Sequence, residues 1–436
     1  MDATFLGSTP QNSESNIIFC FVANGRISEN RIREMFDQRV FKLKDFRDHL
    51  VYKKLSQYPV RFLGFAFLKT DKSFNLHNHV REYDYDNVIS PKPATEELLK
   101  EVLPDLLTKS WELNQSHWEV LNVHPFKSTG AASQKNVSEN QSLVIIRFEH
   151  SLMDGLSAIE LFRVLFKSPF SMPGPVRNAV KLSEMQKIKL WCLIPYELAK
   201  TLPFLLRRRF LGKGDPSKSW FYSVSKSIPV STIKTIKEKF SVNFASILRS
   251  CINGGICQVL DEQGQLPPEH IDALSTLGTP DHPGGTTNHM RLVMDVVPLK
   301  SLSSLDRLLA TDSILKESEC QGSTLSTLYL FRLISMFPLA ICRSICLTLY
   351  ILGPSYFLSI LPSTTSQDFI DEAEIVDVYV QLSLNSPIGM GIAVWGLNNK
   401  QRINILQTPN LFSSDKPITS LTASIVQKLE ELGKLN

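Results

Sequence analysis

The feature that most constrains the fold is a nearly continuous apolar run that leads into a short polar motif. Residues 142–149 read Ser-Leu-Val-Ile-Ile-Arg-Phe-Glu, and His150-Ser-Leu-Met-Asp154-Gly155 follows directly. A run this apolar predicts a strand buried on both faces. The next residues carry a capping-box spacing and the apolar period of a helix, predicted from about Ser157. A doubly buried strand followed at once by an amphipathic helix predicts a mixed α/β fold.

Similar signals recur along the whole chain. Pro104 is expected to kink or divide a helix over 94–113. The length of 436 residues allows about two to three domains. With 43% hydrophobic and 21% charged residues, wholesale disorder is excluded. Strands are also predicted at 16–22, 220–228, 290–299, 374–384, 390–397 and 402–407, and helices at 28–36, 245–260, from 231 and from 418.

The motif after the strand carries the chemistry. His150 stands at a strand end, which holds its imidazole rigidly and leaves it open on one side. Imidazole is the side chain best tuned to accept a proton near pH 7. Gly155 allows a close backbone approach that a Cβ would block, and Asp154 is placed to anchor the turn or to pair with a distant Arg. Taken alone, so short a motif more often marks a strand-end histidine and a turn cap than a catalytic site.

The motif and its surroundings resemble the wax ester synthase/diacylglycerol acyltransferase family, within the CoA-dependent acyltransferase superfamily. That family's signature is His-His-x-x-x-Asp-Gly after a buried strand. Other matches follow the family's order along most of the chain: Met1-Asp-Ala-Thr-Phe-Leu6, Phe74-Asn-Leu-His-Asn-His-Val-Arg81, Trp118-Glu119, Val242-Asn243, residues 293–299, the hydrophobic block 325–361 and the glycine-bearing strand 389–395.

The chain departs from the family pattern at several positions. Glu149 replaces the first histidine of the pair, while the second, catalytic one is retained as His150. Phe244 replaces the aspartate of the family's Asn-Asp motif, and Ser116-His117 replaces the Pro-Leu before its tryptophan. The family's Asn-x-Pro-Gly-Pro segment is not recognisable, and residues 363–365 are expected in its place.

The resemblance implies a two-lobed α/β fold of the chloramphenicol-acetyltransferase-like, CoA-dependent acyltransferase type, with the active site between the lobes. The expected division is an N-terminal lobe over 1–180, a basic amphipathic linker over 181–218 and a C-terminal lobe over 219–436. The C-terminal lobe includes the apolar segment 325–361.

The activity that the resemblance implies is transfer of a fatty acyl group from acyl-CoA to a long-chain alcohol or to diacylglycerol. His150 is the expected general base, Asp154 and Gly155 are expected to be structural, and no cofactor is permanently bound, since acyl-CoA is a co-substrate. Two alternatives stay open: a non-catalytic relative that binds acyl-CoA or lipid, favoured by Glu149 and Phe244, and an acyltransferase for short-chain alcohols.

Three further residues are candidates for the lining of the site. Glu149 would raise the pKa of His150 if the two side chains faced each other. Neighbouring strand residues point to opposite faces, so a solvent-facing or core-edge role is expected instead. Asn243 either lines the site or caps the following helix, the role that Asn favours. Trp118 is expected to pack at a lobe junction. No metal is expected, because His77 and His79 lack a third ligand nearby.

Charge and hydropathy are unevenly distributed. Residues 181–213 hold eight basic and two acidic residues, whereas the net charge of the chain is +4. Arg332 and Arg343 lie eleven residues apart, on one face if the segment is a single helix. Residues 325–361 are therefore expected to form an interfacial helix, with a buried core helix and a true membrane span as alternatives.

These patterns predict an anionic lipid surface as a partner rather than nucleic acid. The expected place is the cytoplasmic face of a membrane, either the endoplasmic reticulum or a lipid droplet. The odd number of seven cysteines favours a reducing compartment. Residues 1–15 carry no recognisable secretory signal.

Overall fold

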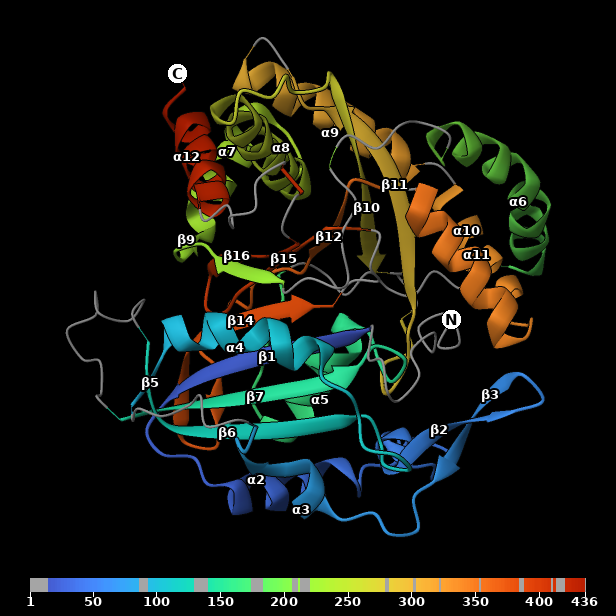
Figure 1. Cartoon of the computed structure of the whole chain (residues 1–436), viewed down its shortest axis with the longest axis vertical. Coiled ribbons are helices and arrows are strands. Elements are labelled where there is room, and N and C mark those ends of the chain that lie inside the picture. Colours follow the sequence, from blue (N-terminus) through green and yellow to red (C-terminus); the bar gives the residue numbers. More distant parts are fainter. Residues whose placement is uncertain are drawn as a thin grey trace.

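The chain forms two lobes, each built on one mixed β-sheet, as seen in a computed structural model (Figure 1). This confirms the predicted two-lobed α/β fold class. The structure describes residues 15–85, 93–128, 140–173, 183–205, 211, 220–278, 282–300, 303–320, 323–352, 354–383, 388–408, 411–412 and 420–435.

The first lobe is a seven-stranded sheet in the order β13-β14-β1-β7-β6-β4, with β5 also paired to β6. The buried run of the sequence is β7, and all nine of its residues are buried, as predicted. Its antiparallel neighbours are β1 and β6. The strands are β1 (Asn16–Asn24), β4 (Val80–Glu82), β5 (Ala94–Thr95), β6 (Trp118–Lys127), β7 (Gln141–Glu149), β13 (Phe369–Ile370) and β14 (Ala373–Leu382).

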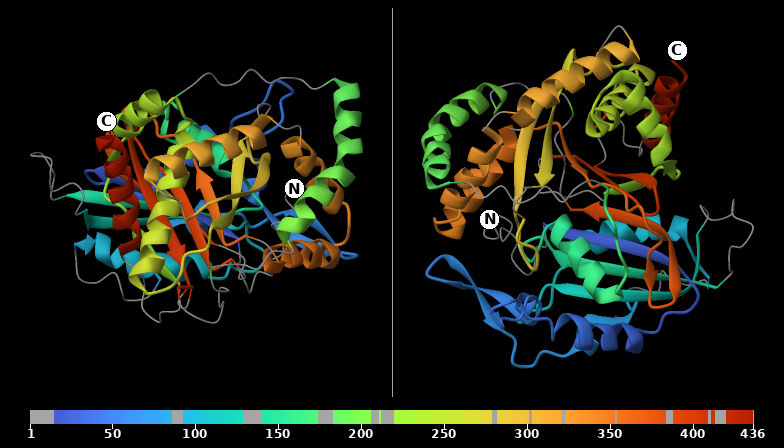
Figure 2. Two further views of the ribbon diagram at one scale, coloured as in Figure 1. Left: turned by 90° about the horizontal axis from the view of Figure 1, so that it is seen from above. Right: turned by 180° about the vertical axis from the view of Figure 1, so that it is seen from behind.

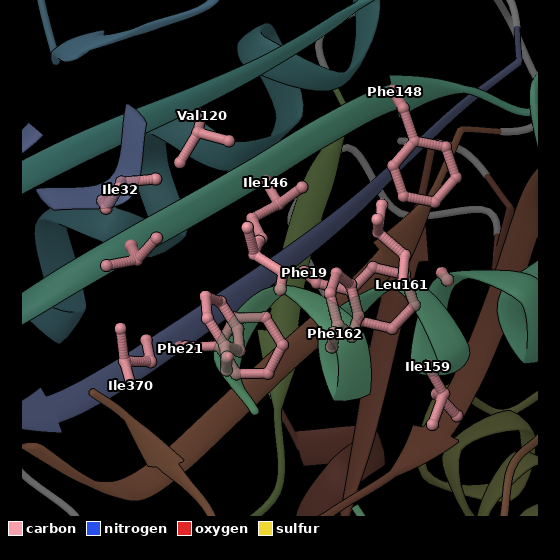
Figure 3. Packing of buried hydrophobic residues seen from close by; sticks show 14 of the residues in the cluster. Phe19, Phe21, Ile32, Val120, Ile146, Phe148, Ile159, Leu161, Phe162 and Ile370 are labelled. Carbon is pink, nitrogen blue, oxygen red and sulfur yellow. The ribbon is translucent and has the colours of Figure 1, made fainter. Parts of the chain in front are cut away.

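Helices cover both faces of this sheet. On one face lies α5, and an aromatic core fills the space beneath it (Figure 3). The ring of Phe162 on α5 meets Phe19 and Phe21 of β1 edge to face, at centroid distances of 5.0 and 4.9 Å. The helices of the lobe are α2 (Glu29–Met35), α3 (Leu76–His79), α4 (Glu96–Thr108) and α5 (Gly155–Phe166).

The start of α5 differs slightly from the prediction. The helix begins at Gly155, and its N-cap is Asp154 rather than Ser157. Asp154 is extended (φ −90°, ψ 179°), and its carboxylate accepts the backbone N–H of Ser157. Aspartate is among the best N-caps, so it takes precedence over the serine. Helix α4 includes Pro104 without being divided there.

The second lobe is a seven-stranded sheet in the order β11-β10-β12-β15-β16-β8, with β9 also paired to β16. Helices α7, α8, α9 and α12 gather at the top of this lobe (Figure 1). The strands are β8 (Phe221–Val224), β9 (Ile228–Pro229), β10 (His270–Gly278), β11 (Met290–Pro298), β12 (Tyr356–Ile360), β15 (Met390–Trp395) and β16 (Lys400–Gln407), and the helices are α7 (Val230–Phe240), α8 (Phe244–Glu262), α9 (Ser304–Cys320) and α12 (Ser420–Lys434).

The chain crosses between the lobes near its C-terminus, which differs from the expected boundary of 219–436. Strand β14 pairs with β1 in the first sheet, in register from Ile17↔Leu382 to Val22↔Asp377, and the register shifts before Ala23↔Ile375. Trp395 of β15 also enters the first core and meets Phe19 edge to face. The apolar strand β1 needs a partner on each edge, and a segment from the far end of the sequence supplies one.

The prediction of one interfacial helix over 325–361 is wrong. The segment forms α10 (Ser323–Ile334), α11 (Leu339–Leu352) and strand β12. The chain breaks around Pro338, which cannot continue a helix, so Arg332 and Arg343 belong to different helices. Among the described residues, no helix has both the length and the apolar character to cross a membrane.

Part of the expected linker is helical. Helix α6 (Glu184–Leu205) packs along α10, where Leu190 and Ile194 form a small apolar cluster with Tyr329. In the views of Figure 2, α6, α10 and α11 lie together at the rim of the molecule. The basic run at 207–209 and the N-terminal motif at 1–6 lie outside the described residues.

Candidate active site

His150 lies where the two lobes meet. It follows directly on β7 of the first sheet, and its backbone N–H donates to the carbonyl of Ser15 at 2.6 Å. The described part of the connection between β10 and β11 of the second lobe, residues 282–289, reaches His150. His150 is partly exposed.

Asn288 of that connection fixes the proton on His150. The amide Nδ2 of Asn288 donates to the carbonyl oxygens of His150 (2.7 Å) and Ser151 (3.3 Å). This leaves its Oδ1 facing the Nδ1 of His150 at 2.9 Å. Because that oxygen can only accept, Nδ1 carries the hydrogen and Nε2 of the neutral ring keeps its lone pair. Nε2 is therefore the basic nitrogen.

Two glycines allow the 282–289 loop to lie this close to the first lobe. Gly284 and Gly285 have positive φ angles of 71° and 63°, which side chains rarely adopt. A Cβ on Gly284 would stand 2.3 Å from the carboxylate of Glu160 on α5, and one on Gly285 would stand 3.2 Å from Val51. The Gly-Gly pair therefore permits the loop contact.

Asp154 joins the two loops through its carboxylate. It accepts from the backbone N–H groups of Ser157 (2.9 Å) and His289 (2.8 Å), and from His282 Nε2 at 2.9 Å. The partner of the carboxylate is thus an imidazole, where an Arg had been considered. Gly284 donates to Nδ1 of His282 at 3.1 Å, so the ring hydrogen lies on Nε2 and points at Asp154.

Burial of Asp154 by itself raises the pKa of its carboxyl, but the contacts with His282 and the two backbone N–H groups outweigh it. The pKa of Asp154 therefore lies below its usual value. Two further hydrogen bonds run from the first lobe to the loop of the second. The backbone N–H of Asp154 and the hydroxyl of Ser157 both donate to the carbonyl of Thr287, each at 3.0 Å. Asp154 thus organises the junction, and it is Asn288 that contacts the imidazole of His150.

Glu149 points away from this junction and is fully buried. Its carboxylate lies 2.6 Å from Nδ1 of His117 and accepts the Ser151 hydroxyl at 3.1 Å. The ring of His117 in turn stacks on Trp111, with the ring planes 6° apart. The expected solvent-facing role is wrong, while the core-edge role agrees with the structure. The two departures Glu149 and His117 therefore form a pair with each other.

Trp118 is a packing residue, as expected, but it lies in the core of the first lobe rather than at the predicted lobe junction. Its ring stacks on His79 at 4.6 Å, and its indole N–H donates to the carbonyl of Leu55 at 2.7 Å. His77 and His79 lie in the short helix α3 rather than on a strand, and Nδ1 of His79 bonds the Trp118 carbonyl. No group able to hold a metal occurs among the described residues.

The remaining two candidates have structural surroundings. Asn243 is the N-cap residue of α8, and its backbone N–H donates to Asp312 of α9 at 2.8 Å, within the helices of the second lobe. At Gly155 a Cβ would stand 3.1 Å from the side chain of Leu361, just after β12. The close approach that Gly155 allows is therefore with the second lobe.

Asn288, His282 and His289 were not among the residues predicted for the site. The signal that could have found them is a cluster of loop-forming and polar residues, Gly-Gly-Thr-Thr-Asn-His, directly before a predicted strand.

Solved structures with the same fold span nearly the whole chain. The wax ester synthase/diacylglycerol acyltransferase from Marinobacter aquaeolei VT8 has a TM-score of 0.63 at 14% identity, covering 99% of this chain and 97% of that one. The first condensation domain of the calcium-dependent antibiotic synthetase, in complex with substrate analogue 3a, gives 0.59 at 9% identity, with 99% and 94% covered. The EpoB cyclization-docking bidomain from Sorangium cellulosum gives 0.59 at 12% identity, with 97% and 81% covered.

No protein-family model matches the sequence, and no curated protein matches it either. Identities of 9–14% show the fold, which is the acyltransferase-type fold shared by the wax ester synthase/diacylglycerol acyltransferase and the condensation domains.

Proposed function

We propose that the protein is an acyl-CoA-dependent O-acyltransferase of the wax ester synthase/diacylglycerol acyltransferase type. Its substrates are a fatty acyl-CoA and a long-chain alcohol, diacylglycerol or both. The observation that carries this proposal is the hydrogen bond from His150 Nδ1 to Asn288, which makes Nε2 the basic nitrogen at the junction of the two lobes.

In this mechanism Nε2 of His150 takes the proton of the alcohol hydroxyl as the oxygen attacks the thioester carbonyl carbon. The new C–O bond forms a tetrahedral oxyanion, which collapses with cleavage of the C–S bond. The leaving CoA thiolate takes the proton back from Nε2, so the imidazole ends neutral. Proton transfer of this kind contributes typically about 10²–10⁴-fold, and holding both substrates at the junction adds proximity.

One observation favours this family over the condensation domains. The sequence motifs occur in that family's order from Met1 to Trp395. We also propose that the enzyme works at the cytoplasmic face of a membrane, the endoplasmic reticulum or a lipid droplet, because both lipid substrates partition there.

The test is a thiol-release assay with purified protein, acyl-CoA donors of several chain lengths, and a panel of alcohols and diacylglycerol. We expect turnover with long-chain acceptors and its loss in His150→Ala, with the circular dichroism spectrum and melting temperature retained. Undiminished turnover in that variant would refute the proposed mechanism.

The second candidate is a non-catalytic relative that binds acyl-CoA or lipid. It is favoured by Glu149, which removes the first histidine of the family motif and forms a buried pair with His117 instead. Acyl-CoA binding by calorimetry, without thiol release for any acceptor, would support this candidate. Turnover confined to short-chain alcohols would instead support the short-chain acyltransferase.

A further inference from the structure

An unusually apolar hairpin projects from the first lobe. Among the described strands, β2 (Gln57–Phe62) and β3 (Phe65–Thr70) pair only with each other, and they extend away from both sheets (Figure 1). Exposed apolar side chains crowd its tip, where Leu63 is 80% and Phe62 64% exposed, together with Phe65, Phe67 and Leu68. An isolated two-stranded hairpin is only marginally stable in water, and exposed aromatics do not help it there.

The hairpin tip touches the corner between α10 and α11. The carbonyl of Gly64 accepts the backbone N–H of Leu339 at 2.8 Å, and a Cβ on Gly64 would stand 3.4 Å from Pro338. This corner also exposes apolar side chains, those of Leu333, Met336, Phe337 and Ile341. We call the hairpin tip and this corner together the apolar rim.

The apolar rim combines parts that are distant in sequence. The hairpin belongs to the first lobe, whereas α10 and α11 follow the second lobe's helix α9. The hairpin and the two helices lie on the same side of the molecule in opposite views (Figures 1 and 2). A surface that docks through the rim would therefore contact both lobes.

The two segments that form the apolar rim carry charges of one sign. Residues 49–70 and 323–352 contain no Asp or Glu. They contain six Lys and Arg residues, and all but one of these are exposed: Lys53, Lys54, Arg61, Lys69, Arg332 and Arg343. Apolar side chains framed by cations complement a surface that is apolar inside and anionic outside, which is a bilayer with anionic headgroups.

We propose that the apolar rim is a docking site for an anionic lipid surface, with the β2–β3 hairpin inserting its tip between the headgroups. This inference rests on the proposed function, because an enzyme whose acceptors are lipids has to reach the bilayer that holds them. It differs from the sequence-based expectation, since the hairpin was not part of the segments assigned to the membrane.

The experiment is flotation of the full-length protein with vesicles of phosphatidylcholine alone or with added phosphatidylserine. We expect the wild type to float with the anionic vesicles. The fraction that floats should fall at least tenfold at high salt, because salt screens exposed charges. The double variant Phe62→Ser/Phe67→Ser should lose flotation at both salt concentrations. The matched control is Leu266→Ser, an exposed leucine between α8 and β10 in the other lobe, which should float like the wild type.

Charge is tested separately by Arg61→Gln/Lys69→Gln, which should weaken binding to anionic vesicles and leave a salt-independent remainder. Melting temperatures within error of the wild type establish that each variant is folded. Equal flotation of wild type and hairpin variant would overturn the proposal. So would a wild-type dimer in solution that the hairpin variant converts to monomer, because the rim would then bind a second copy.

Thiol release from a water-soluble short-chain acyl-CoA and alcohol separates this inference from the proposed function. Hairpin variants should retain that activity, since the rim does not include His150. Flotation without turnover on short-chain or long-chain substrates would support the docking site and refute the proposed enzymatic activity. Turnover with equal flotation of the wild type and the hairpin variants would support the activity and refute the docking site.

Discussion

The two loops that meet at the candidate site differ in how they are built. Residues 150–155 come directly off a buried strand, so their place is set by the chain next to them. Residues 282–289 arrive from the other lobe and are held by contacts with α5 and with Asp154. The first loop supplies the imidazole of His150, and the second decides which of its nitrogens carries the hydrogen. The position of a candidate catalytic residue can therefore be set by its own loop, while the position of its hydrogen is set by a distant part of the chain.

The largest effect is expected from removing the carboxylate of Asp154, which joins the two loops. Asp154→Ala leaves three donors without an acceptor in a buried place, and we expect a loss of about 3–5 kcal/mol in the free energy of unfolding. Activity should fall with it. Urea denaturation and thiol release measure both. Asp154→Asn is the milder control, because its amide oxygen still accepts; a wild-type stability in the alanine variant would contradict the assigned role.

The next test acts on Asn288, from the second loop. In Asn288→Ala we expect kcat to fall by up to about 10²-fold with little change in KM, because the imidazole is no longer held in one tautomer and position.

Asn288→Asp gives the readout that a merely structural role would not. A carboxylate facing Nδ1–H favours the charged imidazole and raises the pKa of His150. Since the base must be neutral, the acidic limb of kcat/KM against pH should move to higher pH. A pH profile identical to that of the wild type would contradict the assignment of Nδ1 as donor.

A smaller effect is expected at the pair that faces away from the site. Glu149→Leu leaves His117 and the Ser151 hydroxyl without their buried acceptor, and should cost about 1–3 kcal/mol in the free energy of unfolding. Adding His117→Leu should recover part of that loss in a double-mutant cycle. Strictly additive losses would show that the pair is not coupled.

The smallest expected effect is on the pH dependence of stability. The folded-state pKa of Asp154 is lowered, so the unfolded state binds more protons at low pH. Stability from this group is present above the carboxyl's unfolded pKa of about 3.9 and is lost as the pH falls through the lower folded value. Urea midpoints between pH 6 and pH 3 should fall more steeply in the wild type than in Asp154→Asn. Parallel curves of urea midpoint against pH for the two proteins would argue against a lowered pKa of Asp154.

Much of the fold was predictable because its signals are local. The doubly buried strand β7, the capped helix α2 and the strands near the C-terminus follow directly from apolar period and turn residues. The errors came where a local pattern had two solutions. The long apolar block looked like one helix, but the chain turns between Ile334 and Leu339, and β12 is needed as a central strand of the second sheet.

By itself, the sequence determined the strand-loop-helix unit that presents His150, because neighbouring residues fix its geometry. Only the tertiary structure decided that β14 completes the first sheet, that Asp154 pairs with His282, and that Asn288 orients His150. Each of these contacts joins residues more than 120 positions apart, as in the separation of 138 between His150 and Asn288. Such contacts have no local pattern in the sequence, because the packing of whole helices and strands brings these residues together.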